Sequence, residues 1–166
     1  LGLVLQYSVT DSTPDRFATA ARPYGFGHFG QAGLRLVLRH DTRDRPGDPH
    51  HGLLADFAAG VFPALWDVPS AFGTISAGGA AYLTVPVPLH PILVLRGGGK
   101  KLFGDFPFHE AAFIGGPGTL RSLDLQRYAG DAAMYGRAEL RVPLARFPLV
   151  LPLELGMFGV LEAGRV

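Results

Sequence analysis

The chain has 166 residues, enough for one domain of ordinary size, and its formal net charge is only +1. No run of basic residues is present, which argues against nucleic acid as a partner, and the absence of cysteine excludes a disulfide framework and thiolate metal sites. Glycine (23) and proline (14) are plentiful, yet apolar residues reach 48%. This combination suits many strands separated by tight turns better than it suits a disordered chain.

Alternating apolar and polar residues predict seven strands in chain order. In a strand, successive side chains point to opposite faces, so strict alternation indicates one apolar and one polar face. The clearest run places Ile75 and Leu83 on one face and Ser76 and Tyr82 on the other. The last run begins at Leu151. The seven runs cover residues 1–10, 34–39, 53–61, 74–85, 93–100, 134–142 and 151–162.

The length of these runs favours a membrane over water as the medium of the apolar face. Strands of soluble domains usually have about five or six residues, whereas strands that cross a bilayer need about 9–11. No apolar stretch is long enough for a transmembrane helix, so a membrane-spanning chain of this kind must form a closed barrel. We therefore expect an all-β fold, an antiparallel transmembrane β-barrel. A soluble β-sandwich or barrel remains the alternative.

The expected connections alternate in length, as in outer-membrane barrels. The shorter set would be periplasmic and the longer set extracellular. Because the chain starts at Leu1 and stops at Val166 within an apolar stretch, we expect it to be a fragment. The connection at 41–51 is expected to be turn-like and those at 86–91 and 144–148 short, whereas 63–72 is intermediate, 11–27 long and 104–133 very long.

Three groups of residues form a set of motifs in a fixed order. The first is Asp41-Thr42-Arg43-Asp44 with Pro49 and Gly52. The second is Ile114-Gly115-Gly116, Leu120-Arg121, Gln126-Arg127-Tyr128, Gly130-Asp131 and Glu139-Leu140-Arg141, and the third is 158–166. Together they resemble the barrels of the BamA/TamA-like proteins, which help other outer-membrane barrels to insert. The first group is similar to the family's periplasmic hairpin, the second to its sixth extracellular loop and the strand that follows, and the third to the next strand.

This resemblance implies that residues 1–166 form a single partial barrel domain, about seven strands, the seventh to the thirteenth of a sixteen-stranded barrel. The periplasmic domains and the remaining strands would lie outside this chain. With two unpaired edges, the piece is not expected to be stable alone in a bilayer.

In the family, the arginine of the long loop docks on acidic residues of the inner wall. Carried onto this sequence, the arginine is Arg121 and its partners are Glu139 and Glu162, both already on polar faces by alternation. A guanidinium can meet a carboxylate through two parallel hydrogen bonds. The alternative is a solvated loop arginine. Ser122-Leu123 depart from the glycine and aromatic residue that the family has there, which puts assembly activity in doubt.

The end of the long loop contains Arg127 and Asp131, where the chain returns into a strand. Asp131 is expected either to cap the turn or to pair with Arg127. Trp66, with Phe62 and Phe72, is interpreted as an aromatic girdle at the membrane edge.

Two other motifs are weak. Gly97-Gly98-Gly99-Lys100 lacks the full spacing of a phosphate loop and is expected to ease sheet curvature. His50 and His51 beside Asp48 lack a third ligand, so no metal is expected.

The function expected from the resemblance is non-enzymatic insertion, assembly or translocation of outer-membrane proteins in the bacterial outer membrane, without a cofactor. The partners would be outer-membrane lipid and unfolded outer-membrane proteins. The alternatives are a passive channel or membrane anchor for an attached domain, and a soluble β-domain with a binding surface.

Overall fold

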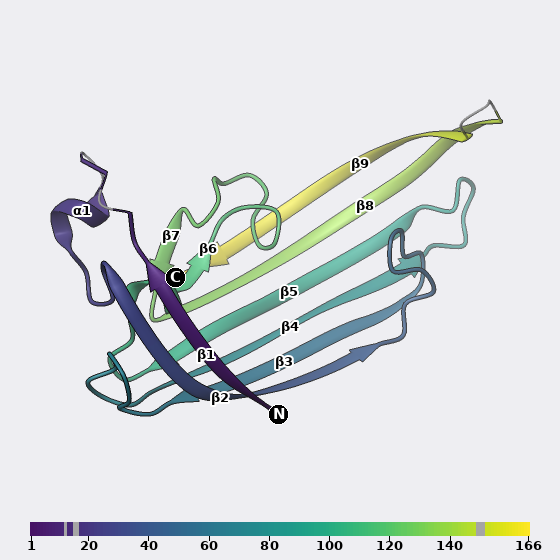
Figure 1. Cartoon of the computed structure of the whole chain (residues 1–166). Helices are drawn as coiled ribbons and strands as arrows, with labels where there is room; N and C mark the ends of the chain where they lie inside the picture. The colour runs from purple at the N-terminus through teal and green to yellow at the C-terminus, as the bar shows by residue number, and fades with distance from the viewer. Residues whose placement is uncertain (12, 15–16, 149–151) are drawn as a thin grey trace.

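The structure is a computed structural model that describes residues 1–11, 13–14, 17–148 and 152–166. The fold is all-β and antiparallel, as the alternation predicts, and its main sheet has seven strands in sequential order. β1 and β9 form its two edges, so the sheet is open (Figure 1). Its strands are β1 (Gly2–Val9), β2 (His28–Asp41), β3 (Gly52–Phe62), β4 (Phe72–Thr84), β5 (Ile92–Phe103), β8 (Ala132–Pro148) and β9 (Pro152–Arg165).

The remaining elements are short and lie in the connections between strands. Among the described residues, no helix combines the length and the apolar character needed to cross a bilayer. The sheet curls along its width, and β6 and β7 lie inside the curve, between β1 and β9 (Figure 1). These short elements are α1 (Phe17–Ala21), the 3-10 helix η1 (Phe108–Glu110), β6 (Ala112–Ile114) and β7 (Tyr128–Gly130).

The register of the strands separates two chemically different faces. Glu139 lies opposite Val94 and Val160, and Arg137 lies opposite Arg96 and Glu162. We call the face that carries these residues the loop face, because residues 104–131 pack against it. The opposite side is the apolar face.

The apolar face is uncovered across the whole width of the sheet. Each strand carries at least one large apolar side chain on this face that is 38% to 78% exposed. In water, such a continuous apolar surface would be unusually large for a monomeric domain. One such residue from each strand is Leu5, Leu34, Phe57, Ile75, Leu95, Met134 and Leu161.

A small apolar cluster lies on the loop face, at the end of the sheet that carries the long connections. Phe62 and Phe72 stack at 4.6 Å between ring centroids and are only 4% and 3% exposed, packed with Phe29 and Val68. The expectation that Phe62 and Phe72 belong to an exposed girdle is therefore wrong. They are partners in the register of β3 and β4 and point to the loop face, where neighbouring connections cover them.

Trp66 does lie at the surface at this same end. It is 57% exposed, and its ring stacks on Tyr7 of β1 at 6.0 Å between centroids. The ring also covers Gly30 of β2, whose amide donates a hydrogen bond to Asp67. A Cβ at this position would lie 2.2 Å from the Trp66 ring, so glycine allows the ring to pack directly on the strand.

Several element boundaries differ from the sequence expectation. The turn expected at 144–148 is strand, because β8 continues to Pro148 past an irregularity between Pro143 and Ala145. Leu151, the first residue of the last expected run, lies outside the described residues. The glycines 97–99 do not interrupt β5, which pairs on both sides. The long loop contains secondary structure of its own, η1 and the β6–β7 pair.

We expect Gly30→Ala to displace the Trp66 ring, because the new methyl group overlaps it. The cost should be about 1 kcal/mol, the low end for overpacking, since the ring can move towards solvent. The emission maximum of Trp66, the sole tryptophan of the sequence, should shift. Gly136→Ala is the matched control, because a Cβ there has open space. An unchanged Trp66 spectrum in Gly30→Ala would contradict the packing described.

Candidate functional site: the docked loop

Residues 104–131 fold back onto the loop face through a tight reversal at Gly115 and Gly116. Both have positive φ, 125° and 90°, and a Cβ at Gly115 would lie 2.1 Å from the Asp124 carbonyl oxygen. The Gly115 amide donates to the Thr119 hydroxyl at 2.9 Å, and the Gly116 amide donates to the Leu123 carbonyl at 3.0 Å. These bonds hold the tip of the loop in one conformation, which carries Arg121 towards β8.

Glu139 of β8 is the buried charge that meets the tip of the loop. The residue is 3% exposed. Arg141 donates from Nε to Glu139 Oε1 at 2.5 Å, and Arg121 Nη1 lies 3.3 Å from Glu139 Oε2. The structure thus brings Arg121 and Glu139 together, but through a single ion contact rather than the expected two parallel hydrogen bonds, because Arg141 on the same strand already holds the other oxygen.

Glu162 of β9 holds the loop through a backbone group. Its Oε2 accepts the Ser122 amide hydrogen at 3.2 Å, and its Oε1 lies 3.6 Å from Arg137 Nη1. Arg137 also donates to the Pro117 carbonyl at 3.3 Å. The expected pair between the Arg121 and Glu162 side chains is absent from the ion pairs of the described residues. Arg137 lies directly opposite Glu162 in the register and occupies the carboxylate instead.

A second anchor holds the beginning of the loop and was not predicted from the sequence. Lys100 Nζ donates to the Glu110 carbonyl at 2.7 Å and lies 3.5 Å from Glu110 Oε2. Gln31 of β2, fully buried, donates to Glu110 Oε1 at 2.9 Å and to Gln6 Oε1 at 3.1 Å. Alternation placed Lys100 on the polar face, but Gln31 precedes the second predicted run, so no pattern indicated its role.

At the far end of the sheet, the hairpin between β2 and β3 is held by its own acidic residues. Arg43 donates from Nε and Nη2 to the two oxygens of Asp41, at 2.8 and 2.7 Å. The amides of His51 and His50 donate to Asp44, which keeps the pKa of that carboxyl below its usual value.

The close of this hairpin requires a glycine. Gly52 has φ 107°, and a Cβ there would lie 2.4 Å from the Thr42 carbonyl oxygen. The conformation therefore explains why glycine ends the hairpin motif.

Ion contacts connect this hairpin to the docked loop. Asp48 Oδ1 of the hairpin lies 3.4 Å from Arg141 Nη1. Arg141 binds Glu139, and Glu139 contacts Arg121. A chain of four alternating charges, Asp48, Arg141, Glu139 and Arg121, therefore joins the hairpin to the docked loop through two neighbouring loop-face positions of β8.

Asp131, where the loop returns into β8, was expected either to cap the turn or to pair with Arg127. Asp131 pairs with Lys101 of β5, and this contact holds the pKa of the Asp131 carboxyl below its usual value. Arg127 is exposed, and its guanidinium takes part in no ion pair or hydrogen bond among the described residues.

His50 Nε2 lies 3.2 Å from Asp48 Oδ2. Within the part of the chain that the structure describes, histidine, aspartate and glutamate form no group of three suited to a metal ion. A scan against protein-family models finds none that matches this chain, and a search of curated proteins finds no match either.

The contacts predict a graded response of loop docking to arginine removal. Arg141→Ala takes away the only hydrogen bond that the described residues give to the buried carboxylate of Glu139, and should cost about 2–3 kcal/mol. Arg121→Ala should cost about 1 kcal/mol, because Arg121 is 42% exposed and solvent screens its contact. The measurement is the temperature at which the full-length protein in detergent loses its folded mobility on a gel.

Arg127→Ala is the matched control for this series. It removes the same charge from the same loop, but from a side chain without a partner, and should leave the transition temperature unchanged. Equal effects of Arg121→Ala and Arg127→Ala would show that the Arg121 contact contributes nothing to stability.

Proposed function

We propose that this chain is part of the wall of an outer-membrane β-barrel of the BamA/TamA-like kind, contributing the seventh to the thirteenth strands. In this proposal the whole protein inserts other outer-membrane proteins without enzyme chemistry or a cofactor. One observation carries the proposal: each of the seven strands has exposed apolar side chains on one face of the sheet, while the buried charges and the long loop share the opposite face.

Strand length supports hydrocarbon as the medium of the apolar face. β2, β4, β5, β8 and β9 have 12 to 17 residues, more than the roughly 9–11 needed to cross a bilayer at a tilt. A soluble sandwich would bury these side chains beneath a second sheet. The unpaired edges at β1 and β9 would be satisfied in a bilayer by the remaining strands of a closed barrel.

The apolar cluster and the docked loop argue against an open pore. Phe29, Phe62 and Phe72 pack on the loop face at the end of the long connections, and Tyr24 packs against them. The Phe108 amide donates to the Tyr24 carbonyl at 2.9 Å, which joins two long connections above the cluster. A wall filled in this way favours an assembly barrel over a passive channel.

The departure at Ser122-Leu123 does not remove the contacts of the loop. Ser122 reaches Glu162 through its backbone amide, and Leu123 accepts from Gly116 through its backbone carbonyl. Because both contacts use backbone atoms, most other residue types could make them as well. The altered side chains are therefore compatible with the family's docked loop.

Depletion of the full-length protein from its host tests the proposed function. We expect the amounts of other folded outer-membrane barrels to fall. Expression of the wild-type gene should restore these amounts. Unchanged barrels together with single-channel conductance would favour the passive channel. Recovery of the full-length protein in the aqueous phase without detergent would overturn the membrane proposal altogether.

A further inference from the structure

The apolar face carries charge at one end only. Among the strand residues whose side chains are described, Lys101 and Arg165 are the only lysine, arginine, aspartate or glutamate residues on this face. Both are cationic, and both lie at the end of the sheet that carries the long connections. All other described positions of the apolar face are aliphatic, aromatic, methionine, histidine, alanine or glycine.

The two cations flank one small residue. Lys101 of β5 lies opposite Ala132 of β8, and Arg165 of β9 lies opposite Met134, two residues further along β8. The methyl group of Ala132 leaves space between the two long side chains. A compact anionic group above Ala132 can therefore be reached from both sides.

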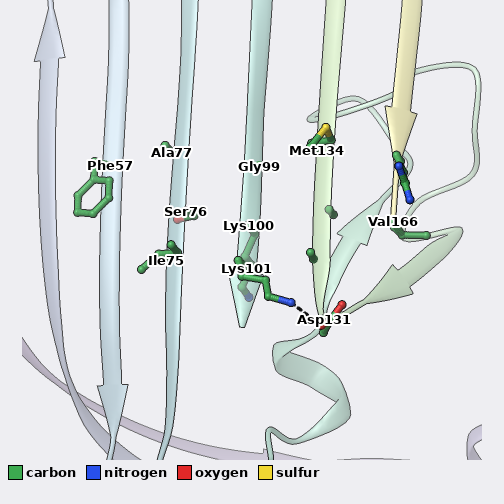
Figure 2. A pocket seen from close by; sticks show the side chains of 13 residues that line it. Phe57, Ile75, Ser76, Ala77, Gly99, Lys100, Lys101, Asp131, Met134 and Val166 are labelled. Carbon is green, nitrogen blue, oxygen red and sulfur yellow. Dashed lines mark hydrogen bonds and ion pairs between the residues drawn. The ribbon is translucent and has the colours of Figure 1, made fainter. Parts of the chain in front are cut away.

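A groove of about 590 Å³ continues from this point along the apolar face. Figure 2 shows Phe57 and Ile75 on one side of it and Met134 on the other, with Gly99 between them. Small residues form its floor, so larger neighbours stand above them. A narrow apolar groove that ends at two cations matches a molecule with a hydrocarbon chain and an anionic head.

We propose that this groove binds an anionic lipid of the leaflet on the long-loop side. Lys101 and Arg165 hold its phosphate, and the groove holds one of its acyl chains. The inference rests on the proposed membrane location. Asp131 pairs with Lys101 and shields part of its charge, but Arg165 has no ion pair among the described residues. The three groups together retain a net charge of +1, and the ammonium of Lys101, 40% exposed, keeps further donors free.

Lipid binding to the full-length protein in detergent can be counted by native mass spectrometry. The probe is dioleoyl phosphatidylglycerol, compared with dioleoyl phosphatidylcholine, which has the same acyl chains and no net charge. We expect preferential binding of phosphatidylglycerol. Lys101→Gln and Arg165→Gln should each weaken it about fivefold, the effect of one cation at a membrane surface, and the double variant about twenty-five-fold.

The control is the double variant Arg22→Gln/Arg127→Gln, which removes two exposed cations of the same end away from the groove. It should bind phosphatidylglycerol as the wild type does. Ala132→Phe keeps every charge but fills the space between the cations, and should also weaken binding. Equal losses in the control and in Lys101→Gln/Arg165→Gln, or unchanged binding in Ala132→Phe, would overturn the site.

Two further outcomes separate this inference from the proposed function. Competition by millimolar inorganic phosphate would reveal an ion site without acyl selectivity and overturn the lipid proposal. Equal binding of the two lipids by a protein that partitions into detergent would overturn it while the membrane proposal stands. Partition into the aqueous phase would overturn both.

Discussion

The structure depends on a buried carboxylate beneath the loop, that of Glu139, and on its contacts with two arginines. Glu139 is almost completely buried on the loop face of an open sheet, and an isolated charge in such a position is strongly unfavourable. Two arginines compensate it, Arg141 from the same strand and Arg121 from the loop. Because Arg121 can reach Glu139 only from a loop that folds back, the burial of this one group and the position of residues 104–131 are coupled.

The two faces of the sheet carry different types of residue. Nearly half of the residues are apolar, yet the buried apolar clusters are small, and the exposed apolar residues lie along every strand. The buried polar groups, in contrast, lie on one face only. Gln31, Arg137 and Glu139, the buried polar residues of the described part, all lie on the loop face and all bind other polar groups there. The exposed apolar side chains therefore lie mostly on the apolar face, and the buried charges lie on the loop face.

The sequence predicted the strands and their faces because alternation follows directly from strand geometry. It placed Glu139 and Glu162 correctly on one face for the same reason. It did not predict which groups meet. Arg137 takes the Glu162 carboxylate because the register of β8 and β9 sets them opposite each other, and a register cannot be obtained from one strand alone. Gln31 and Glu110 are 79 residues apart, and only the folded loop brings them together.

Phe62 and Phe72 illustrate the same limit at the ends of strands. Their aromatic character suits a membrane edge, and nothing local shows that connections from elsewhere in the chain cover them. Trp66, four residues after Phe62, lies outside the sheet against Tyr7. The face to which a side chain points and the connections that cover that face, rather than residue type, decide which aromatic side chain is exposed.

The charges of Glu139 and Arg141 on β8 also link the β2–β3 hairpin to the docked loop. Asp48 and Glu139 share Arg141, and Arg141 and Arg121 share Glu139. When neighbouring charges share a partner, the loss of one contact changes the free energy that the next contact contributes. Their contributions to stability are therefore not additive. The hairpin and the tip of the docked loop are therefore linked through two residues of β8, Glu139 and Arg141.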